Sequence, residues 1–427
     1  MPRNVFVIGL DEPNRALLEL LPAARDCTFH PLLSFEELRG VEHFPIPELL
    51  AEAERRLDNF EGSIDAITTI IDFPATEFVP LLARPRGLHT PSLEGVLACN
   101  HKYWSRQLQE EAAPEAVPGY AILDPYGDDP LAATGLEPPI WVKPLNAFRS
   151  HLGFRINQPQ DLYAALPVIR EELPRLAAPF ESVLKYADLP PRLAELGGKV
   201  CIAEQIISGR LCTVEGYVQH GVPHVYGIVD SVRAPNRSSF ARYQYPSSLP
   251  PPVQRRIVDI AERVMTSIGL DHSPFNMELF YNARRDTIAV LEINPRLSQS
   301  HAPLFDLVDG VSHLQVMTDV ALGRPPEMQS GQGRYDIAAK FFLRAYRDAR
   351  VTAVPSEQQI ARIIERIPGT KISALVEEST QLSDLEDQDA YSFELAEVYL
   401  GARSNRELLA RWHAVREELA FGLQDPD

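Results

Sequence analysis

Cysteine is scarce in this sequence, which has four (Cys27, Cys99, Cys201 and Cys212) in 427 residues and no C-x-x-C pair. The missing pair excludes the usual ligand spacing of a zinc ribbon and of a dithiol redox site. We do not expect a disulfide framework in a chain this long with so few cysteines, and this favours a reducing compartment, the cytoplasm.

Positive charge and long apolar runs are also lacking. The chain carries 41 Lys+Arg against 59 Asp+Glu, a net charge of −18. This balance excludes the broad basic face that nucleic acid needs but leaves room for a local cationic pocket. No uncharged apolar run reaches the roughly 18 residues of a membrane helix, and the run at 5–10 is too short for a secretory signal. We therefore expect neither nucleic acid nor a membrane as a partner.

Two glycine-rich phosphate loops are missing. The pattern G-x-x-x-x-G-K-[ST] occurs nowhere in the sequence. The turn after the first apolar run, Gly9-Leu10-Asp11-Glu12, lacks the second and third glycines of G-x-G-x-x-G. A leucine and two acids would meet the pyrophosphate there, so we do not expect a dinucleotide site in this turn.

The elements that are present predict an α/β protein followed by α+β regions. Apolar runs at 4–10 and 63–71 predict buried strands. A helical pattern at 11–24 follows the first run, and another at 47–60 precedes the second, as in a parallel sheet with helices on its faces. Further elements expected are strands at 140–144, 199–207, 335–346 and 391–400, a hairpin over 213–230 turning at His220-Gly221, a helix at 251–268, and a helical stretch at 159–198 interrupted by prolines.

An acidic hairpin is the most informative stretch. Segments 275–281 and 287–294 flank a polar loop, and a turn centred on Arg285 places Glu278 opposite Glu292. Asn294 lies two residues beyond Glu292 and shares its face. Opposed carboxylates repel, and Mg²⁺ or Mn²⁺, which prefer oxygen ligands, would compensate. The alternative is a set of solvated polar positions on an exposed sheet face.

Cations and one further acid stand at the ends of predicted elements. Lys143 closes the strand 140–144 and precedes a loop with Arg149 and Ser150, which suits phosphates by charge and hydroxyl contacts. Lys102 begins a helical region, and Glu204 lies near the end of an apolar strand. Ordinary solvated side chains at element ends are the alternative for each of them. Arg233, Arg237 and Arg242 lie in a segment that suits either a carboxylate-binding loop or a plain surface loop.

Taken in order, these pieces resemble the ATP-grasp superfamily over about residues 95–320. The motifs are Asn100-His101-Lys102, the WVKP strand with Lys143, the EQIISG hinge at 204–209, TVEG at 213–216, NMEL at 276–279 and EINPR at 292–296. The resemblance implies a Rossmann-like pre-ATP-grasp domain at 1–95. It also implies an ATP-grasp domain of two α+β subdomains clasping ATP at 96–325, with a lid at about 120–207, and a C-terminal α+β lobe at 326–427.

The resemblance also implies roles for individual residues. Lys102, Lys143 and Ser150 would contact the ATP phosphates, and Glu204 would take the adenine amino group beside backbone contacts from Gln205 and Ile207. Glu278, Glu292 and Asn294 would bind Mg²⁺ or Mn²⁺. Arg296, with Lys143, would be catalytic by stabilising the transferring phosphoryl group and the acyl phosphate.

The implied activity is ATP-dependent joining of a small carboxylic acid, such as an amino acid, to an amine or a thiol. Biotin-carboxylating relatives have an acid where this chain has Ser300, although His301 is retained, so that activity is an alternative with less support. A second alternative is a non-catalytic ATP-binding scaffold. Leu211 stands where the family often has an acid for ribose. Homodimers are common among similar proteins, so one is an expectation here.

Overall fold

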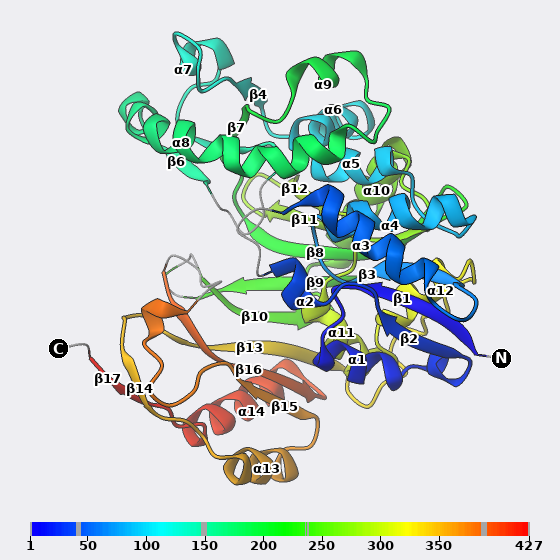
Figure 1. Ribbon diagram of the computed structural model, residues 1–427. Coiled ribbons are helices and arrows are strands. Elements are labelled where there is room, and N and C mark those ends of the chain that lie inside the picture. Colours follow the sequence, from blue (N-terminus) through cyan, green and yellow to red (C-terminus); the bar gives the residue numbers. More distant parts are fainter. Residues whose placement is uncertain are drawn as a thin grey trace.

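The structure, a computed structural model, describes residues 2–39, 44–146, 152–234, 236, 239–385 and 391–425. Its strands form four sheets in the described part of the chain. Figure 1 shows a small sheet with the long helix α8 at one end of the molecule and the C-terminal elements at the other, with the N-terminal layer beside the middle.

The N-terminal layer is a parallel sheet, as the sequence predicts. Its strands are in the order β2-β1-β3, with β1 (Arg3–Ile8), β2 (Cys27–Pro31) and β3 (Ala66–Thr69). Helices α1 (Glu12–Glu19), α2 (Phe35–Arg39), α3 (Ile46–Asp58) and α4 (Ala75–Ala83) accompany it. All four residues of β3 are buried, which fits a strand covered on both faces.

A separate antiparallel sheet lies within the region expected to form the lid, and by that expectation it is called the lid sheet. Its order is β4-β7-β5-β6, with β4 (Tyr120–Leu123), β5 (Ile140–Pro144), β6 (Phe154–Ile156) and β7 (Cys201–Gln205). Its helices are α7 (Pro130–Thr134), α8 (Pro159–Leu184) and α9 (Pro191–Leu196).

Helix α8 corrects one expectation, because the prolines do not interrupt it. It runs through Pro167, Pro174 and Pro179 for 26 residues. Pro167 is exposed and the other two are half-buried, whereas Leu166, Ile169 and Leu173 on the apolar face are buried. Burial of that face offsets the hydrogen bonds that the prolines remove, and water can satisfy the freed carbonyl groups on the outer side.

The main sheet has eight antiparallel strands in the order β12-β11-β8-β9-β10-β13-β16-β15. These are β8 (Arg210–Gln219), β9 (Val222–Arg233), β10 (Phe240–Tyr245), β11 (Ser273–Asn282), β12 (Thr287–Asn294), β13 (Ile337–Ala345), β15 (Thr370–Ala374) and β16 (Phe393–Ala402). The predicted turn at His220-Gly221 is confirmed, with Gln219 paired to Val222 and positive φ at both turn residues. Strands from either side of the proposed 325/326 boundary share this sheet.

The remaining helices pack around the main sheet. They are α5 (Leu93–Asn100), α6 (Lys102–Ala112), α10 (Pro251–Ile268), α11 (Ala302–Asp309), α12 (Leu314–Ala321), α13 (Glu357–Arg366) and α14 (Asn405–Glu418), and a small sheet pairs β14 (Arg350–Ala353) with β17 (Gly422–Gln424). Met277, Leu279 and Val290 of the acidic hairpin join a core with residues of α10, so the opposite face of that hairpin is left for polar side chains. No helix in the described ranges has the length and apolar character needed to cross a membrane.

Candidate active site

The acidic hairpin brings its two carboxylates together as predicted. Glu278 of β11 pairs directly with Glu292 of β12, and Asn276 pairs with Asn294. Within the described residues, neither carboxylate has a hydrogen bond or ion pair. Burial and the facing Glu292 carboxylate raise the pKa of Glu278. The two acids therefore lie opposite each other, and no cation from the described part of the chain is bonded between them.

The pairing of Glu278 with Glu292 depends on a β-bulge. Near the turn, Asn282 pairs with Thr287 and Leu279 with Val290, so the hairpin is not centred on Arg285. The register then shifts between Glu278 and Leu279, because Leu291 has no partner of its own on β11. The predicted pairing is correct, but a bulge at Leu291 produces it rather than the assumed turn.

Arg106 holds this bulge and was not identified from the sequence. Its guanidinium group donates to the carbonyl oxygens of Val290 at 2.8 Å and Leu291 at 2.9 Å. The same group donates from Nε to Glu204 Oε1 at 2.6 Å. Arg106 lies on α6 and is only 2% exposed. One buried side chain thus joins α6, the lid strand β7 and the metal-binding candidate β12.

Lys143 and Glu204 form an ion pair inside the lid sheet. Lys143 Nζ of β5 lies 2.7 Å from Glu204 Oε2, and Arg106 occupies the other oxygen. Burial by itself would raise the pKa of Glu204, but the two neighbouring cations lower it to about 2. Lys143 and Glu204, both predicted as site residues, are therefore in direct contact, and the Glu204 carboxylate is ionised.

Lys102 lies where α6 begins, at the junction with the lid. Its backbone N–H donates to the carbonyl of Leu145 at 3.1 Å, just after β5. Burial and the Lys143 cation lower the pKa of Lys102 to about 8, although Glu292 and Glu204 oppose this. The charges of Lys102, Lys143, Glu204 and Glu292 therefore influence one another.

The predicted adenine hinge continues from the end of β7. Gln205 is exposed and its backbone N–H donates to Gly119 O at 2.8 Å, while Ile207 is half-buried. Ser150, predicted to touch phosphates, lies outside the described residues, as does Arg149.

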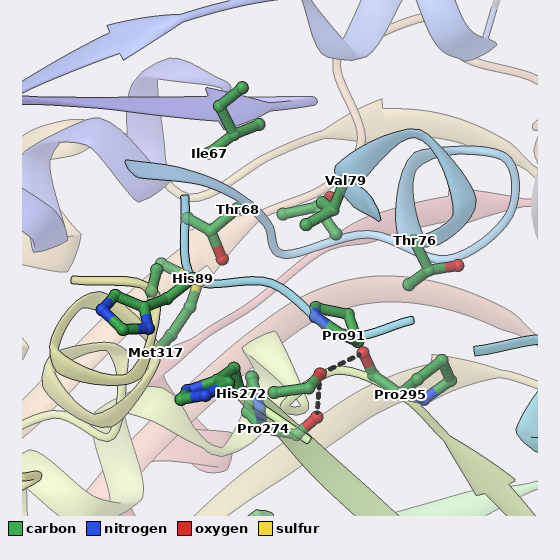
Figure 2. Close-up of a pocket in the computed structure, with 13 residues that line it drawn as sticks. Ile67, Thr68, Thr76, Val79, His89, Pro91, His272, Pro274, Pro295 and Met317 are labelled. Carbon is green, nitrogen blue, oxygen red and sulfur yellow. Dashed lines mark hydrogen bonds between the residues drawn. The ribbon is translucent and has the colours of Figure 1, made fainter. Parts of the chain in front are cut away.

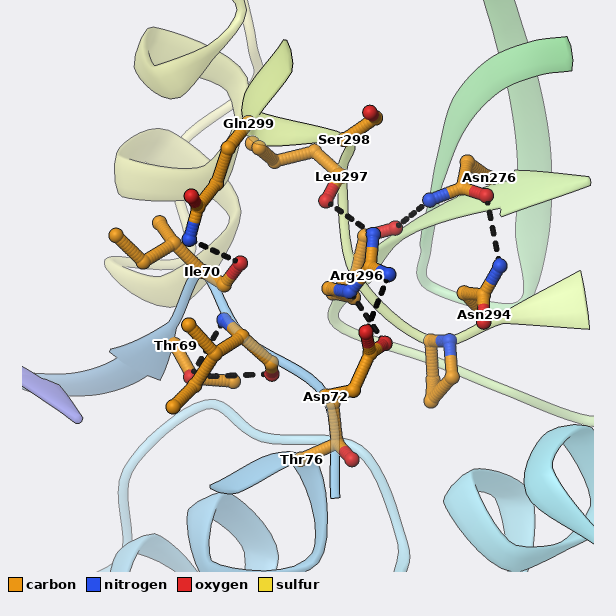
Figure 3. A network of polar contacts seen from close by, with 12 residues as sticks. Thr69, Ile70, Asp72, Thr76, Asn276, Asn294, Arg296, Leu297, Ser298 and Gln299 are labelled. Carbon is orange, nitrogen blue, oxygen red and sulfur yellow. Dashed lines mark hydrogen bonds and ion pairs between the residues drawn. The ribbon is translucent and has the colours of Figure 1, made fainter. Parts of the chain in front are cut away.

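Arg296 is held by an aspartate of the N-terminal layer, as Figure 3 shows. Asp72, which follows β3, accepts from Arg296 Nε at 2.5 Å and from Nη2 at 2.6 Å. On the other side, Asn276 Nδ2 donates to the backbone carbonyl of Arg296 at 3.0 Å. Asn294 Nδ2 in turn donates to Asn276 Oδ1 at 2.9 Å, which fixes the amide of the predicted metal ligand.

A second buried acid lies beyond Arg296. Glu215, from the TVEG motif, is fully buried, and its Oε1 lies 2.7 Å from His301 Nδ1. Burial raises the pKa of Glu215 and lowers that of His301. Ser300, one residue earlier, accepts from Lys340 Nζ of β13 at 3.0 Å, and Lys340 also pairs with Glu397 at 2.5 Å. Strands of the C-terminal region therefore reach the candidate site.

The predicted arginine segment is only partly described. Arg233 of β9 stacks on Phe240 with its guanidinium carbon 5.0 Å from the ring centre, and Arg242 Nε of β10 donates to Gln244 at 3.1 Å. Arg237 lies outside the described residues. Burial and the Glu292 carboxylate raise the pKa of Glu278, and the Arg233 charge opposes this.

A small cavity between the N-terminal layer and the main sheet is distinct from the candidate active site. It has a volume of about 20 Å³ and is lined by residues that include Thr68, His89, His272 and Met317 (Figure 2). That volume holds about one water molecule. The cavity is thus too small for a substrate and lies outside the arrangement described above.

Three residues at the centre of the site were missed, for different reasons. Arg106 lies on a helix whose apolar Trp104 and Leu108 suggest that the arginine faces solvent, and tertiary contacts reverse this. Asp72 follows a buried strand, and carboxyl ends of parallel strands are common places for functional groups, so that signal was available. Glu215 belongs to the TVEG motif, but the resemblance implies no role for it.

Comparison with known proteins agrees with this arrangement. The family model for the ATP-grasp domain matches residues 136–303, which include Lys143, Glu204, Glu278, Glu292 and Arg296. A search of curated proteins found no match.

Solved structures show the same fold along the whole chain. The L-amino acid ligase from Bacillus licheniformis has a TM-score of 0.71 at 15% identity, covering 100% of this chain and 99% of its own. Carboxyaminoimidazole ribonucleotide synthase from Aspergillus clavatus, complexed with ATP, has a TM-score of 0.66 at 16% identity, with 98% of each chain covered. Biotin carboxylase from Campylobacter jejuni has a TM-score of 0.64 at 14% identity, covering 99% and 92%. The family match identifies an ATP-grasp domain at residues 136–303 of this chain, and the solved structures share the fold of the chain as a whole.

Proposed function

We propose that this chain is an ATP-dependent ligase that joins a small carboxylic acid, in the simplest case an amino acid, to an amine through an acyl phosphate. The observation that carries the proposal is the opposed pair Glu278 and Glu292, which has no bonded protein cation within the described residues and stands electrostatically close to Lys102 and Arg296. Such a set can hold a divalent cation and a polyphosphate together.

The residues fit Mg²⁺ or Mn²⁺ by their chemistry. Glu278 and Glu292 supply carboxylate oxygens, and Asn294, whose Nδ2 is used by Asn276, can offer its Oδ1. Mg²⁺ usually takes one or two carboxylates and completes its shell with water and phosphate oxygens, which matches this donor set. When bound, the ion would neutralise phosphate charge and orient the phosphoryl group.

The lysines and the hinge would hold ATP. Lys102 and Lys143 supply positive charge for the phosphates, and Ser150 would add a hydroxyl contact. Each oxygen of Glu204 has a second lone pair, beyond the bonds to Arg106 and Lys143, for the adenine amino group. The backbone of Gln205 and Ile207 would meet the adenine ring.

The chemistry then needs two transfers. A carboxylate oxygen of the substrate attacks the γ-phosphorus, the bond to the β–γ bridging oxygen breaks, and ADP leaves. The amine nitrogen next attacks the acyl carbon, the carbon–oxygen bond to phosphate breaks, and inorganic phosphate and one proton are released. Arg296 would stabilise the negative charge of the transferring phosphoryl group and of the acyl phosphate.

Phosphate release and oxygen transfer test this proposal. The purified chain is given Mg·ATP and pairs of amino acids, and phosphate, ADP and new amide products are measured. A carboxylate labelled with ¹⁸O should pass one labelled oxygen to the released phosphate. Glu292→Gln should lower kcat at least about 100-fold, because it removes one of two metal carboxylates. The matched control is Glu54→Gln on the exposed side of α3, which should leave kcat unchanged.

Other results would point elsewhere. Turnover that requires bicarbonate and biotin would support the biotin carboxylase alternative. Binding of Mg·ATP without turnover for any carboxylate and amine would support a scaffold. Unchanged activity in Glu292→Gln would reject the metal site. Light scattering of the same preparation would report whether the chain is the expected homodimer.

A further inference from the structure

Asp72 and Arg296 form a side-on pair between two domains. The carboxylate accepts from Nε at 2.5 Å and from Nη2 at 2.6 Å, and Arg296 Nη1 donates to the carbonyl of Leu297 at 3.0 Å. A guanidinium group has five N–H donors. Three are used by described residues, so two remain for an anion. Side-on pairing fixes the plane of the guanidinium group, and therefore the direction of the two remaining donors.

The loop that carries Asp72 contacts the same segment at a second point. Gln299 Nε2 donates to the backbone carbonyl of Ile70 at 3.0 Å, and Figure 3 shows both contacts on one side of the Arg296–Gln299 segment. Asn276 holds the backbone of Arg296 from the main sheet. The arginine is thus fixed through its backbone by one domain and through its side chain by another.

The two side chains of this pair differ in their exposure to solvent. The Arg296 side chain is 17% exposed and that of Asp72 is 41% exposed. Because Arg296 is mostly buried, removing its partner also lowers stability, and the test must separate this effect from an effect on rate. Orienting a charged group that acts on a transition state has a large effect on rate.

We propose that Asp72 is a positioning residue that orients the Arg296 guanidinium group for formation of the acyl phosphate, so that the N-terminal domain takes part in catalysis without touching the substrate. This inference rests on the proposed ligase function. Asp72 acts through Arg296, and its removal should affect the chemical step more than the binding of ATP.

A second interdomain pair provides a matched control. Asp26 accepts from Arg324 Nη2 at 2.5 Å and from Nη1 at 3.3 Å, and these side chains are 55% and 28% exposed. Asp26 precedes β2, at the amino end of the parallel sheet, whereas Asp72 follows β3 at its carboxyl end. Asp26→Asn therefore removes the same kind of contact from the same domain at the opposite edge of that sheet.

The experiment compares Asp72→Asn with Asp26→Asn in the full chain. We expect Asp72→Asn to lower kcat about 10- to 100-fold while KM for ATP stays within about twofold, since the change misaligns a transition-state contact. Asp26→Asn should leave kcat unchanged. This should hold even if both variants lower Tm by the same few degrees. Asp72→Glu, which restores the charge, should recover part of kcat.

A spectroscopic readout makes the test independent of turnover. The ¹⁵Nε–H signal of Arg296, assigned with Arg296→Lys, should be sharp in the wild type and in Asp26→Asn, and shifted or lost in Asp72→Asn. An unchanged signal in Asp72→Asn, or a fall in kcat no larger than that of Asp26→Asn, would overturn the proposal. Absence of wild-type turnover with every substrate pair would reject the ligase function and the catalytic part of this proposal, while the signal would still decide whether Asp72 orients Arg296.

Discussion

Glu77 is a buried carboxyl group that the proposed chemistry does not use. It lies on α4, is fully buried, and accepts from Thr76 Oγ1 and Asn100 Nδ2, each at 2.7 Å. Burial raises its pKa to about 7, although both hydrogen bonds oppose this. Asn100 stands two residues before Lys102, so Glu77 supports the segment that begins α6, the helix proposed to contact phosphates.

This raised pKa predicts how stability depends on pH. The folded state binds the Glu77 proton more tightly than the unfolded state, whose glutamate titrates near 4.5. The stabilising contribution is therefore complete below that value and is lost as the pH rises to about 7. Measured against Glu77→Gln, the wild type should lose on the order of 3 kcal/mol between pH 4.5 and 8. Thermal unfolding across this range checks it, and equal pH slopes for both proteins would contradict it.

At the scale of elements, Arg106 connects α6, β7 and β12. Its partners are one carboxylate, Glu204, and the carbonyl groups of Val290 and Leu291 at the bulge, and it also donates to Gln109 Oε1 at 2.5 Å. Four acceptors on three elements depend on one planar group. An ammonium group cannot match this geometry.

We therefore expect Arg106→Met to lower the free energy of unfolding by about 3–5 kcal/mol, because it leaves Glu204 buried with one cation fewer. Arg106→Lys should recover little of the loss. The control is Arg263→Met on α10, an arginine with side-chain exposure of 38% and two exposed ion pairs, which should cost under about 1 kcal/mol. Urea denaturation measures all three variants, and similar losses for Arg106→Met and Arg263→Met would show that Arg106 contributes no more than an ordinary surface pair.

The contacts of Arg106 also show which parts of the fold could be predicted from the sequence. Runs of apolar residues predicted the strands β1, β5 and β11 closely, because burial of alternate or successive side chains leaves a direct pattern. The pairing of Glu278 with Glu292 was predictable, but the bulge at Leu291 was not, since Arg106 comes from 185 residues earlier to hold it. Contacts between distant segments leave no periodic trace. The position of Asp72 after a buried strand marks it as a candidate functional residue, but its pairing with Arg296, 224 residues away, leaves no such mark in the sequence.

At the scale of the molecule, α8 links the lid to the N-terminal layer. Leu162 and Ile169 near its start join the core of the lid sheet, whereas Phe180 and Val183 near its end join the N-terminal core. Figure 1 shows the helix extending across this end of the molecule. A ligand that contacts Lys143 in the lid and Glu292 in the main sheet would therefore restrict both bodies at once.

Hydrogen exchange should report this coupling. With Mg·ADP at about 100 times its Kd, we expect amides of β5, β7 and β12 to exchange up to about 100-fold more slowly, since binding stabilises the folded protein by about 2.7 kcal/mol. The small sheet β14–β17 should be unchanged and serves as the internal control. Slowing confined to β12 would mean that the nucleotide does not engage the lid.

The four cysteines give the molecule a practical property. Each of them is buried, with exposures of 0–6%, and burial raises the pKa of every thiol. Thiolate is the reactive form, so all four should resist maleimide reagents in the folded state. A single cysteine introduced at exposed Tyr163 of α8 and another at exposed Glu54 of α3 would then be labelled selectively for fluorescence distance measurements, with no native thiol to remove first.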